Sequence, residues 1–174
     1  MSEFSKTAET TMPLIVAEPE YTVSEIRVQT MRGFDYFHVA KDITMAEIPQ
    51  TFNELIPILD AALDEGKVCK DGPMVARYIE TPGNGERFRL EVGFVVRPGA
   101  QPAGAASVSH VEPYHCASVV YCGSLANLPK GYDALETVIK KAGLRVTWES
   151  CEVYYYFEDG ASPNNVMHLQ HHIE

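Results

Sequence analysis

The chain has 174 residues, with 14 lysines and arginines against 24 aspartates and glutamates, a formal net charge of −10 and 45% hydrophobic residues. The acidic excess argues against a nucleic-acid partner, because affinity for a phosphate backbone comes mostly from lysine and arginine. A membrane partner is not expected either, since no stretch reaches the ~18 to 20 uncharged apolar residues of a membrane-spanning helix and the acidic amino-terminal sequence is not a secretory signal.

Two segments of the chain resemble each other, and each is preceded by a stretch in which no helix or strand is predicted. Residues 1–20 are polar and contain two prolines, which is typical of a loose N-terminal arm. Residues 98–107 are rich in proline, glycine and alanine, which is typical of a linker. We therefore predict a single domain over residues 21–174, in which the linker joins module one (21–97) to module two (108–174).

Module one contains three β-rich runs. Residues 23–41 are dominated by Ile, Val, Phe and Tyr, and Gly33 interrupts them, so we predict a strand with a bulge or turn. Residues 75–80 and 88–96 are predicted to pair as a hairpin around a turn at 81–86, because apolar residues alternate strictly in the second of these runs.

A helix is predicted between the first strand and the hairpin of module one. Apolar residues recur there every three or four positions. Thr44 and Glu47 have the spacing of a capping box at its start, and Gly66 is a plausible stop. Pro57 lies inside the pattern and is expected to kink the helix or divide it.

Module two repeats this order of elements. We predict strands over residues 114–122, 148–157 and 166–173, with a helix ended by Gly143 after the first of them. The apolar stripe of this helix consists of Leu125, Leu128, Tyr132, Leu135 and Ile139.

The two modules align residue by residue in places. Ile48–Leu55 (IPQTFNEL) aligns with Leu128–Leu135 (LPKGYDAL), and Tyr78 aligns with Tyr154. We predict an α+β fold of duplicated strand–helix–strand–strand modules about a pseudo-two-fold axis, with each helix covering one sheet face and the other faces pairing around a central ligand groove. The alternative is a single α+β domain in which the similarity is accidental.

The richest chemistry lies in residues 148–157 (WESCEVYYYF). Strand periodicity places the even-numbered residues on the groove face and the odd-numbered residues on a face that suits a helix-packed core. The groove-facing residues are Trp148, Glu152, Tyr154 and Tyr156. A carboxylate among aromatic rings attracts a flat organic cation through an ion pair and through cation–π contacts of about 0.5 to 2 kcal/mol.

Two other interpretations of Glu152 stay open at this point. Tyrosine-rich strands are common in sheets, so Glu152 can simply face water. A carboxyl desolvated by rings can also serve as a general acid or base.

Two motifs resemble a known family. Cys151–Tyr156 (CEVYYY), which follows an amphipathic helix and the turn Gly143–Val146, resembles the E-x-Y strand of the GyrI-like small-molecule-binding family, also known as bacterial transcription-activator effector-binding domains. Gly72–Tyr78 (GPMVARY) resembles the G-P-x-x-x-x-Y strand of its first module. The likeness extends over residues 22–173.

The resemblance implies a groove that binds bulky aromatic, often cationic compounds, with an acidic residue at the position of Glu152 and tyrosines beside it. Some family members hydrolyse cyclopropane-containing compounds that alkylate DNA, and one modulates DNA gyrase. The chain departs from the family at Tyr121–Leu125 (YCGSL), where the family has H-x-G-P-Y. Leu125 therefore replaces a pocket tyrosine, which argues against tyrosine-assisted hydrolysis.

We expect no metal and no cofactor. His110–Cys116 (HVEPYHC) matches no common metal motif, and His168 and His172 share a strand face that His171 opposes. The four cysteines contain no C-x-x-C pair, so we expect reduced thiols in a cytoplasmic protein; they are Cys69, Cys116, Cys122 and Cys151.

These observations favour a standalone cytoplasmic protein that binds hydrophobic aromatic or cationic small molecules, as in multidrug recognition or sequestration. The expected ligand-binding residues are Glu152, Tyr154, Tyr156, Trp148 and, by pseudo-symmetry, Tyr78. Binding is expected rather than catalysis. The alternatives are a hydrolase of electrophilic, cyclopropanoid compounds that uses Glu152, and an acidic module that docks on a protein partner, such as a gyrase modulator.

Overall fold

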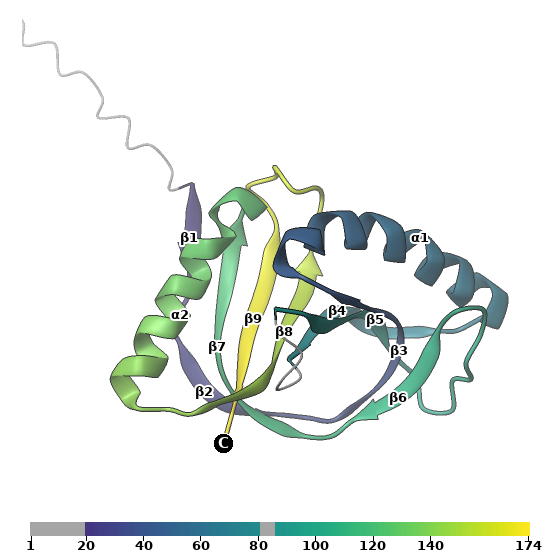
Figure 1. Cartoon of the computed structure of the whole chain (residues 1–174), viewed down its shortest axis with the longest axis horizontal. Coiled ribbons are helices and arrows are strands. Elements are labelled where there is room, and N and C mark those ends of the chain that lie inside the picture. Colours follow the sequence, from purple (N-terminus) through teal and green to yellow (C-terminus); the bar gives the residue numbers. More distant parts are fainter. Residues whose placement is uncertain (1–19, 81–85) are drawn as a thin grey trace, which may run out of the picture.

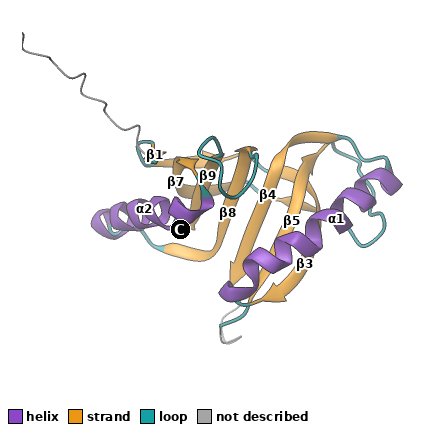
Figure 2. Cartoon of the chain, turned by 90° about the horizontal axis from the view of Figure 1, so that it is seen from above, coloured by secondary structure: helices purple, strands orange, loops and turns teal. Residues whose placement is uncertain are grey.

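The computed structural model describes residues 20–80 and 86–174, which form a nine-stranded antiparallel sheet with two α-helices lying over one of its faces (Figures 1 and 2). The predicted arm lies outside the described residues except for Glu20, and so does the predicted turn except for Glu86. No helix of the described residues combines the length and the apolar character needed to cross a bilayer.

Module one folds in the predicted order. Its elements are β3 (Phe34–Ile43), the 3₁₀ turn η1 (Met45–Glu47), α1 (Ile48–Gly66), β4 (Lys70–Glu80) and β5 (Phe88–Val96). The capping box forms at the 3₁₀ turn, where the Thr44 amide donates to Glu47 Oε2 over 2.8 Å. Helix α1 runs through Pro57 without being divided, and this residue lies on the exposed side of the helix, away from the core.

Module two repeats these elements. They are β7 (Tyr114–Gly123), η2 (Leu125–Asn127), α2 (Leu128–Ala142), β8 (Val146–Tyr156) and β9 (Val166–Ile173). Gly143 ends α2 in the left-handed conformation at φ 65°, which glycine adopts at little cost. The structure thus confirms the α+β fold and the duplicated strand–helix–strand–strand order.

The modules join edge to edge rather than face to face. Strand β4 of module one pairs antiparallel with β8 of module two, so the two sheets are continuous. The expectation that the free sheet faces would pack together was therefore wrong. Alternation along a strand indicates which residues share a face, but it carries no information about which strand lies at the edge.

Short strands of each module pair with a strand of the other module. The run predicted as a strand with a bulge or turn at Gly33 forms two strands: β2 (Arg27–Met31) pairs with β7, whereas β3 pairs with β5 and with β6 (Ser107–Val111). Strand β1 (Tyr21–Val23) also pairs with β7. A Cβ atom on Gly33 would lie 2.7 Å from the Val111 carbonyl oxygen, so this crossover needs a glycine.

Two hydrophobic clusters lie between the helices and the sheet. Leu55 and Leu59 of α1 pack in the first, and Leu135 and Ile139 of α2 pack in the second. Glu152 and Tyr154 of β8 face the helices, since Tyr154 packs against both clusters and Glu152 is hydrogen-bonded to Tyr132 of α2. The prediction that the odd-numbered face of this strand would meet the helix was therefore wrong.

Candidate functional site

The candidate site lies where β4 and β8 pair. Ala76 and Glu152 are direct partners in the register and also occupy equivalent positions in the two modules, so the pseudo-two-fold axis passes between them. Tyr78 and Tyr154 are the equivalent tyrosines two residues further along each strand. Because β4 and β8 run antiparallel, these two rings approach the axis from opposite sides.

The Glu152 carboxylate accepts hydrogen bonds from three tyrosine hydroxyls. Tyr78 and Tyr154 donate to Oε2 over 2.8 and 2.6 Å, and Tyr132 of α2 donates to Oε1 over 2.6 Å. Glu152 is only 5% exposed. Hydrogen bonds to a charged acceptor are short and strong, so the three O–H dipoles replace the water that this carboxylate loses on burial.

The three tyrosines act as donors over a wide pH range. Burial raises the pKa of Tyr78, Tyr132 and Tyr154 well above that of a free phenol, and the negative charge of Glu152 raises each pKa further. The hydroxyls therefore stay protonated at neutral pH. The cluster presents one negative charge surrounded by aromatic carbon.

Tyr132 is absent from the predicted site, although its place in the apolar stripe of the predicted helix indicates a buried hydroxyl. It aligns with Phe52 of α1, whose ring packs against Tyr154 at a centroid distance of 6.2 Å. Phe52 has no hydroxyl, so module one supplies no donor from this position. A tyrosine in the apolar stripe of a helix that covers the sheet needs a buried hydrogen-bond partner, and Glu152 is that partner.

A cavity of about 240 Å³ adjoins the carboxylate cluster at the end of β4 and the start of β8. Tyr78, Trp148 and His171 are aromatic lining residues, and Glu80 adds a carboxylate. The remaining lining residues are Val146, Thr147, Glu149 and Ser150. Trp148 is 61% exposed. Tyr78 connects the cavity to the Glu152 cluster, because its side chain lines the cavity and its hydroxyl donates to Glu152.

Tyr156 lies apart from both features. Tyr154 pairs with Met167 and Tyr156 pairs with the adjacent Val166, so a bulge in β8 breaks the alternation there. The Tyr156 ring is half-exposed, and its hydroxyl donates to Glu158 over 2.8 Å. Of the predicted residues, the structure gathers Glu152, Tyr154 and Tyr78, places Trp148 beside Tyr78, and leaves Tyr156 at the surface.

Leu125 lies in η2, where the family has its pocket tyrosine. Its amide donates to the Gly160 carbonyl oxygen over 2.9 Å, which ties η2 to the loop between β8 and β9. The third hydroxyl at Glu152 thus comes from α2, at Tyr132, and not from this turn.

The fold is similar to those of several solved structures. The C-terminal domain of EcmrR has a TM-score of 0.68 at 11% identity, over 86% of this chain and 97% of that one. SAV2435 bound to tetraphenylphosphonium also has a TM-score of 0.68, at 10% identity, over 87% of this chain and 94% of that one. A hydrolase from Listeria innocua has a TM-score of 0.55 at 9% identity, over 86% and 92% of the two chains.

A comparison with models of protein families gives no match, and neither does a comparison with curated proteins. At these low identities the structural likeness shows the fold. It confirms the GyrI-like fold that the two sequence motifs implied.

Proposed function

We propose that the protein binds bulky, hydrophobic aromatic cations where its two modules meet, with Glu152 as the charge that anchors them. The observation that carries this proposal is a nearly buried carboxylate whose hydrogen-bond donors are three tyrosines. No lysine or arginine is among its hydrogen-bond or ion-pair partners in the described part of the chain. The negative charge is therefore shared with neutral hydroxyls and is not compensated by a cationic side chain of these residues.

Aromatic surfaces beside Glu152 suit the apolar body of such a ligand. Trp148 and Tyr78 line the adjoining cavity, while Phe157, 42% exposed, packs edge-on against Tyr154 at a centroid distance of 5.7 Å. Ring faces attract cations, and the attraction grows where water is excluded. The structure of SAV2435 bound to tetraphenylphosphonium supports this ligand class, because that compound is an aromatic cation.

The role that follows from binding alone is recognition or sequestration of such compounds. We place it in the cytoplasm, because all four cysteines lie in the described residues and are free thiols. An effector-binding role within a larger assembly would use the same site.

The test is a calorimetric titration with tetraphenylphosphonium and with neutral triphenylphosphine oxide. Wild type is expected to prefer the cation by about tenfold or more, and Glu152→Gln to lose that preference. Glu158→Gln is the matched control, because the carboxylate of Glu158 also accepts a hydroxyl, from Tyr156, but is exposed. Equal cation affinity in Glu152→Gln and wild type would remove the anchor role.

The hydrolytic and protein-docking alternatives have separate outcomes. Mass spectrometry of a cyclopropanoid compound after long incubation distinguishes turnover from binding. Three hydroxyls already occupy the Glu152 carboxylate, which disfavours its use as a general base toward water. Docking of the acidic surface on a protein partner would instead be salt-sensitive and indifferent to Glu152→Gln.

A further inference from the structure

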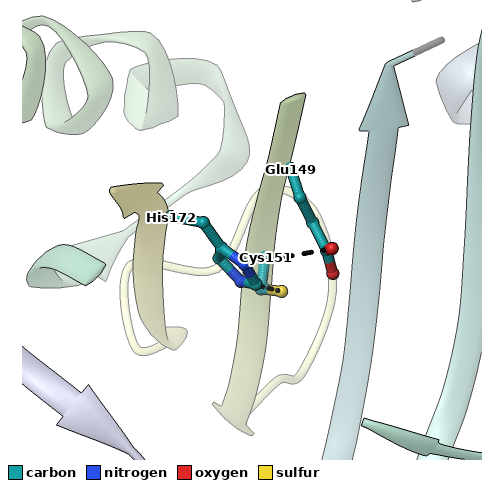
Figure 3. Close-up of side chains that lie close together, drawn as sticks. All are labelled: Glu149, Cys151 and His172. Carbon is teal, nitrogen blue, oxygen red and sulfur yellow. Dashed lines mark hydrogen bonds and ion pairs between the residues drawn. The ribbon is translucent and has the colours of Figure 1, made fainter. Parts of the chain in front are cut away.

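Strand β8 also carries a cluster of ligating side chains on the face opposite the Glu152 site. Glu149 and Cys151 lie on β8, and His172 lies on the neighbouring β9 (Figure 3). Cys151 Sγ is 3.4 Å from His172 Nε2, and His172 Nδ1 is 3.9 Å from Glu149 Oε2. One ligand atom from each of the three residues lies within 4.8 Å of the others.

Neighbouring groups hold two of these side chains in place. Arg77 Nε donates to Glu149 Oε1 over 2.7 Å, so the carboxylate is fixed while Oε2 points toward the imidazole. The Tyr114 ring stacks on His172 at a centroid distance of 3.8 Å. Such partners orient metal ligands in known sites.

We propose that Cys151, His172 and Glu149 bind one divalent transition-metal ion of the zinc type, through the thiolate, one imidazole nitrogen and carboxylate Oε2. Thiolate, imidazole and carboxylate together are a ligand set that zinc uses. Tetrahedral bonds of these lengths place ligand atoms about 3.3 to 3.6 Å apart. The 3.4 Å contact between Cys151 Sγ and His172 Nε2 already meets this separation. The 3.9 Å contact of Glu149 is to Nδ1, the other ring nitrogen, so binding through Nε2 requires the Glu149 carboxylate to move toward that atom. The movement is small, because one ligand atom from each of the three side chains already lies within 4.8 Å of the others.

Charge and access both fit a small ion. A dication bound by one thiolate and one carboxylate gives a site with no net charge. Arg77 would then share Glu149 with the ion, and it keeps its ion pair with Glu91 at 2.8 Å. The Cys151 residue is fully buried and His172 is 7% exposed, whereas the Glu149 side chain is 22% exposed. The Glu149 side thus provides the fourth position, for water.

The sequence spacing hides this site. Its ligands come from two strands that pair antiparallel, at Glu149, Cys151 and His172, so no short C-x-x-C or H-x-x-H pattern is formed. Cys151 and His172 lie behind the strand face that carries Glu152, and Glu149 also lines the adjoining cavity. The proposal rests on the three ligand atoms alone and does not depend on the proposed function.

The test uses the full chain, stripped with a chelator and titrated with Co²⁺. Wild type is expected to bind one equivalent, with a thiolate-to-cobalt charge-transfer band and the visible bands of tetrahedral cobalt, and Zn²⁺ is expected to displace it. Cys151→Ser should lose the charge-transfer band. Cys116→Ser is the matched control, since Cys116 is equally buried on β7 but is not one of the three ligands.

Glu149→Gln separates a metal site from a hydrogen-bonded cluster. It should keep the charge-transfer band while Co²⁺ affinity falls about tenfold or more, and circular dichroism reports whether each variant is folded. Binding of less than about 0.1 equivalent by folded wild type would overturn the proposal. A band that survives in Cys151→Ser, or an affinity unchanged in Glu149→Gln, would overturn it as well.

Discussion

Replacing Tyr132 by phenylalanine should change stability and ligand affinity in opposite directions. The substitution removes a 2.6 Å hydrogen bond to Glu152 and leaves the ring, so no cavity forms. A hydrogen bond to a charged group contributes about 1.5 to 3 kcal/mol, and the free energy of unfolding should fall by that amount. The carboxylate meanwhile loses one of three donors and regains a free lone pair on Oε1.

A bound cation gains from that loss. With the Tyr132 hydroxyl removed, less of the Glu152 charge is compensated by O–H dipoles, so affinity for tetraphenylphosphonium should rise by about three- to tenfold, or ~1 kcal/mol. Urea unfolding followed by circular dichroism measures the first effect, and calorimetry measures the second. The tyrosines that donate to Glu152 would then stabilise the fold and weaken cation binding.

The control is the same substitution at Tyr156, whose hydroxyl also donates to a carboxylate but at the surface. Tyr156→Phe should alter stability by less than about 0.5 kcal/mol. Refutation would take either of two forms: Tyr132→Phe as stable as wild type, or Tyr132→Phe with weaker cation binding. The first would mean that the hydroxyl contributes nothing net, and the second that Tyr132 itself holds the ligand.

Three further substitutions or conditions test the rest of the structure. Gly93→Ala should lower the free energy of unfolding by about 3 kcal/mol or more, because its Cβ would lie 2.3 Å from the Phe37 carbonyl oxygen of the paired strand; wild-type stability in urea would contradict this. Arg77→Ala should cost about 3 to 5 kcal/mol in the same assay, since it removes the cation shared by Glu149 and Glu91 and leaves Glu91 with Arg89 as its remaining arginine. A loss below 1 kcal/mol (about the value of a surface pair) would show that the two carboxylates are solvated. Burial lowers the pKa of His38 and of His168 in the folded protein. With a chelator present, the free energy of unfolding should therefore have its full value above the unfolded-state pKa. It should decrease below about pH 6.5, by up to about 1.4 kcal/mol per pH unit for each histidine. His168→Gln should reduce that slope, and a stability that is flat between about pH 5 and 7.5 would contradict the assignment.

The order of elements in each module could be predicted because it depends on local patterns. The stripe ending at Gly143 and the alternation in β5 are short-range patterns. The structure forms both elements, with Leu135 and Ile139 in the second cluster and the even-numbered apolar residues of β5 packed in the first, whereas Leu125 of the stripe lies in η2. The joining of the modules could not be predicted in this way. It depends on edge pairing between β4 and β8 and on a crossover at Gly33, which are contacts between distant residues.

The candidate site could likewise be predicted in part from the sequence. Glu152, Tyr154 and Tyr78 follow from strand parity and from the repeat, and the structure places their side chains together. Parity fails at Tyr156, because a bulge adds a residue that no pattern in the sequence announces. Tyr132 required knowing that the helix lies over the same face as the carboxylate.

The duplication also explains why the site has one carboxylate and a pair of tyrosines. Residues on a pseudo-two-fold axis meet their own counterparts, so a glutamate at both Ala76 and Glu152 would place two buried negative charges in directly opposed positions of β4 and β8. Such a pair is destabilising, and its members cannot both stay ionised. Tyrosines tolerate duplication because two hydroxyls can share one acceptor oxygen, as Tyr78 and Tyr154 share Glu152 Oε2. The asymmetry between alanine and glutamate is therefore what turns a symmetric pair of modules into a site with a single negative charge.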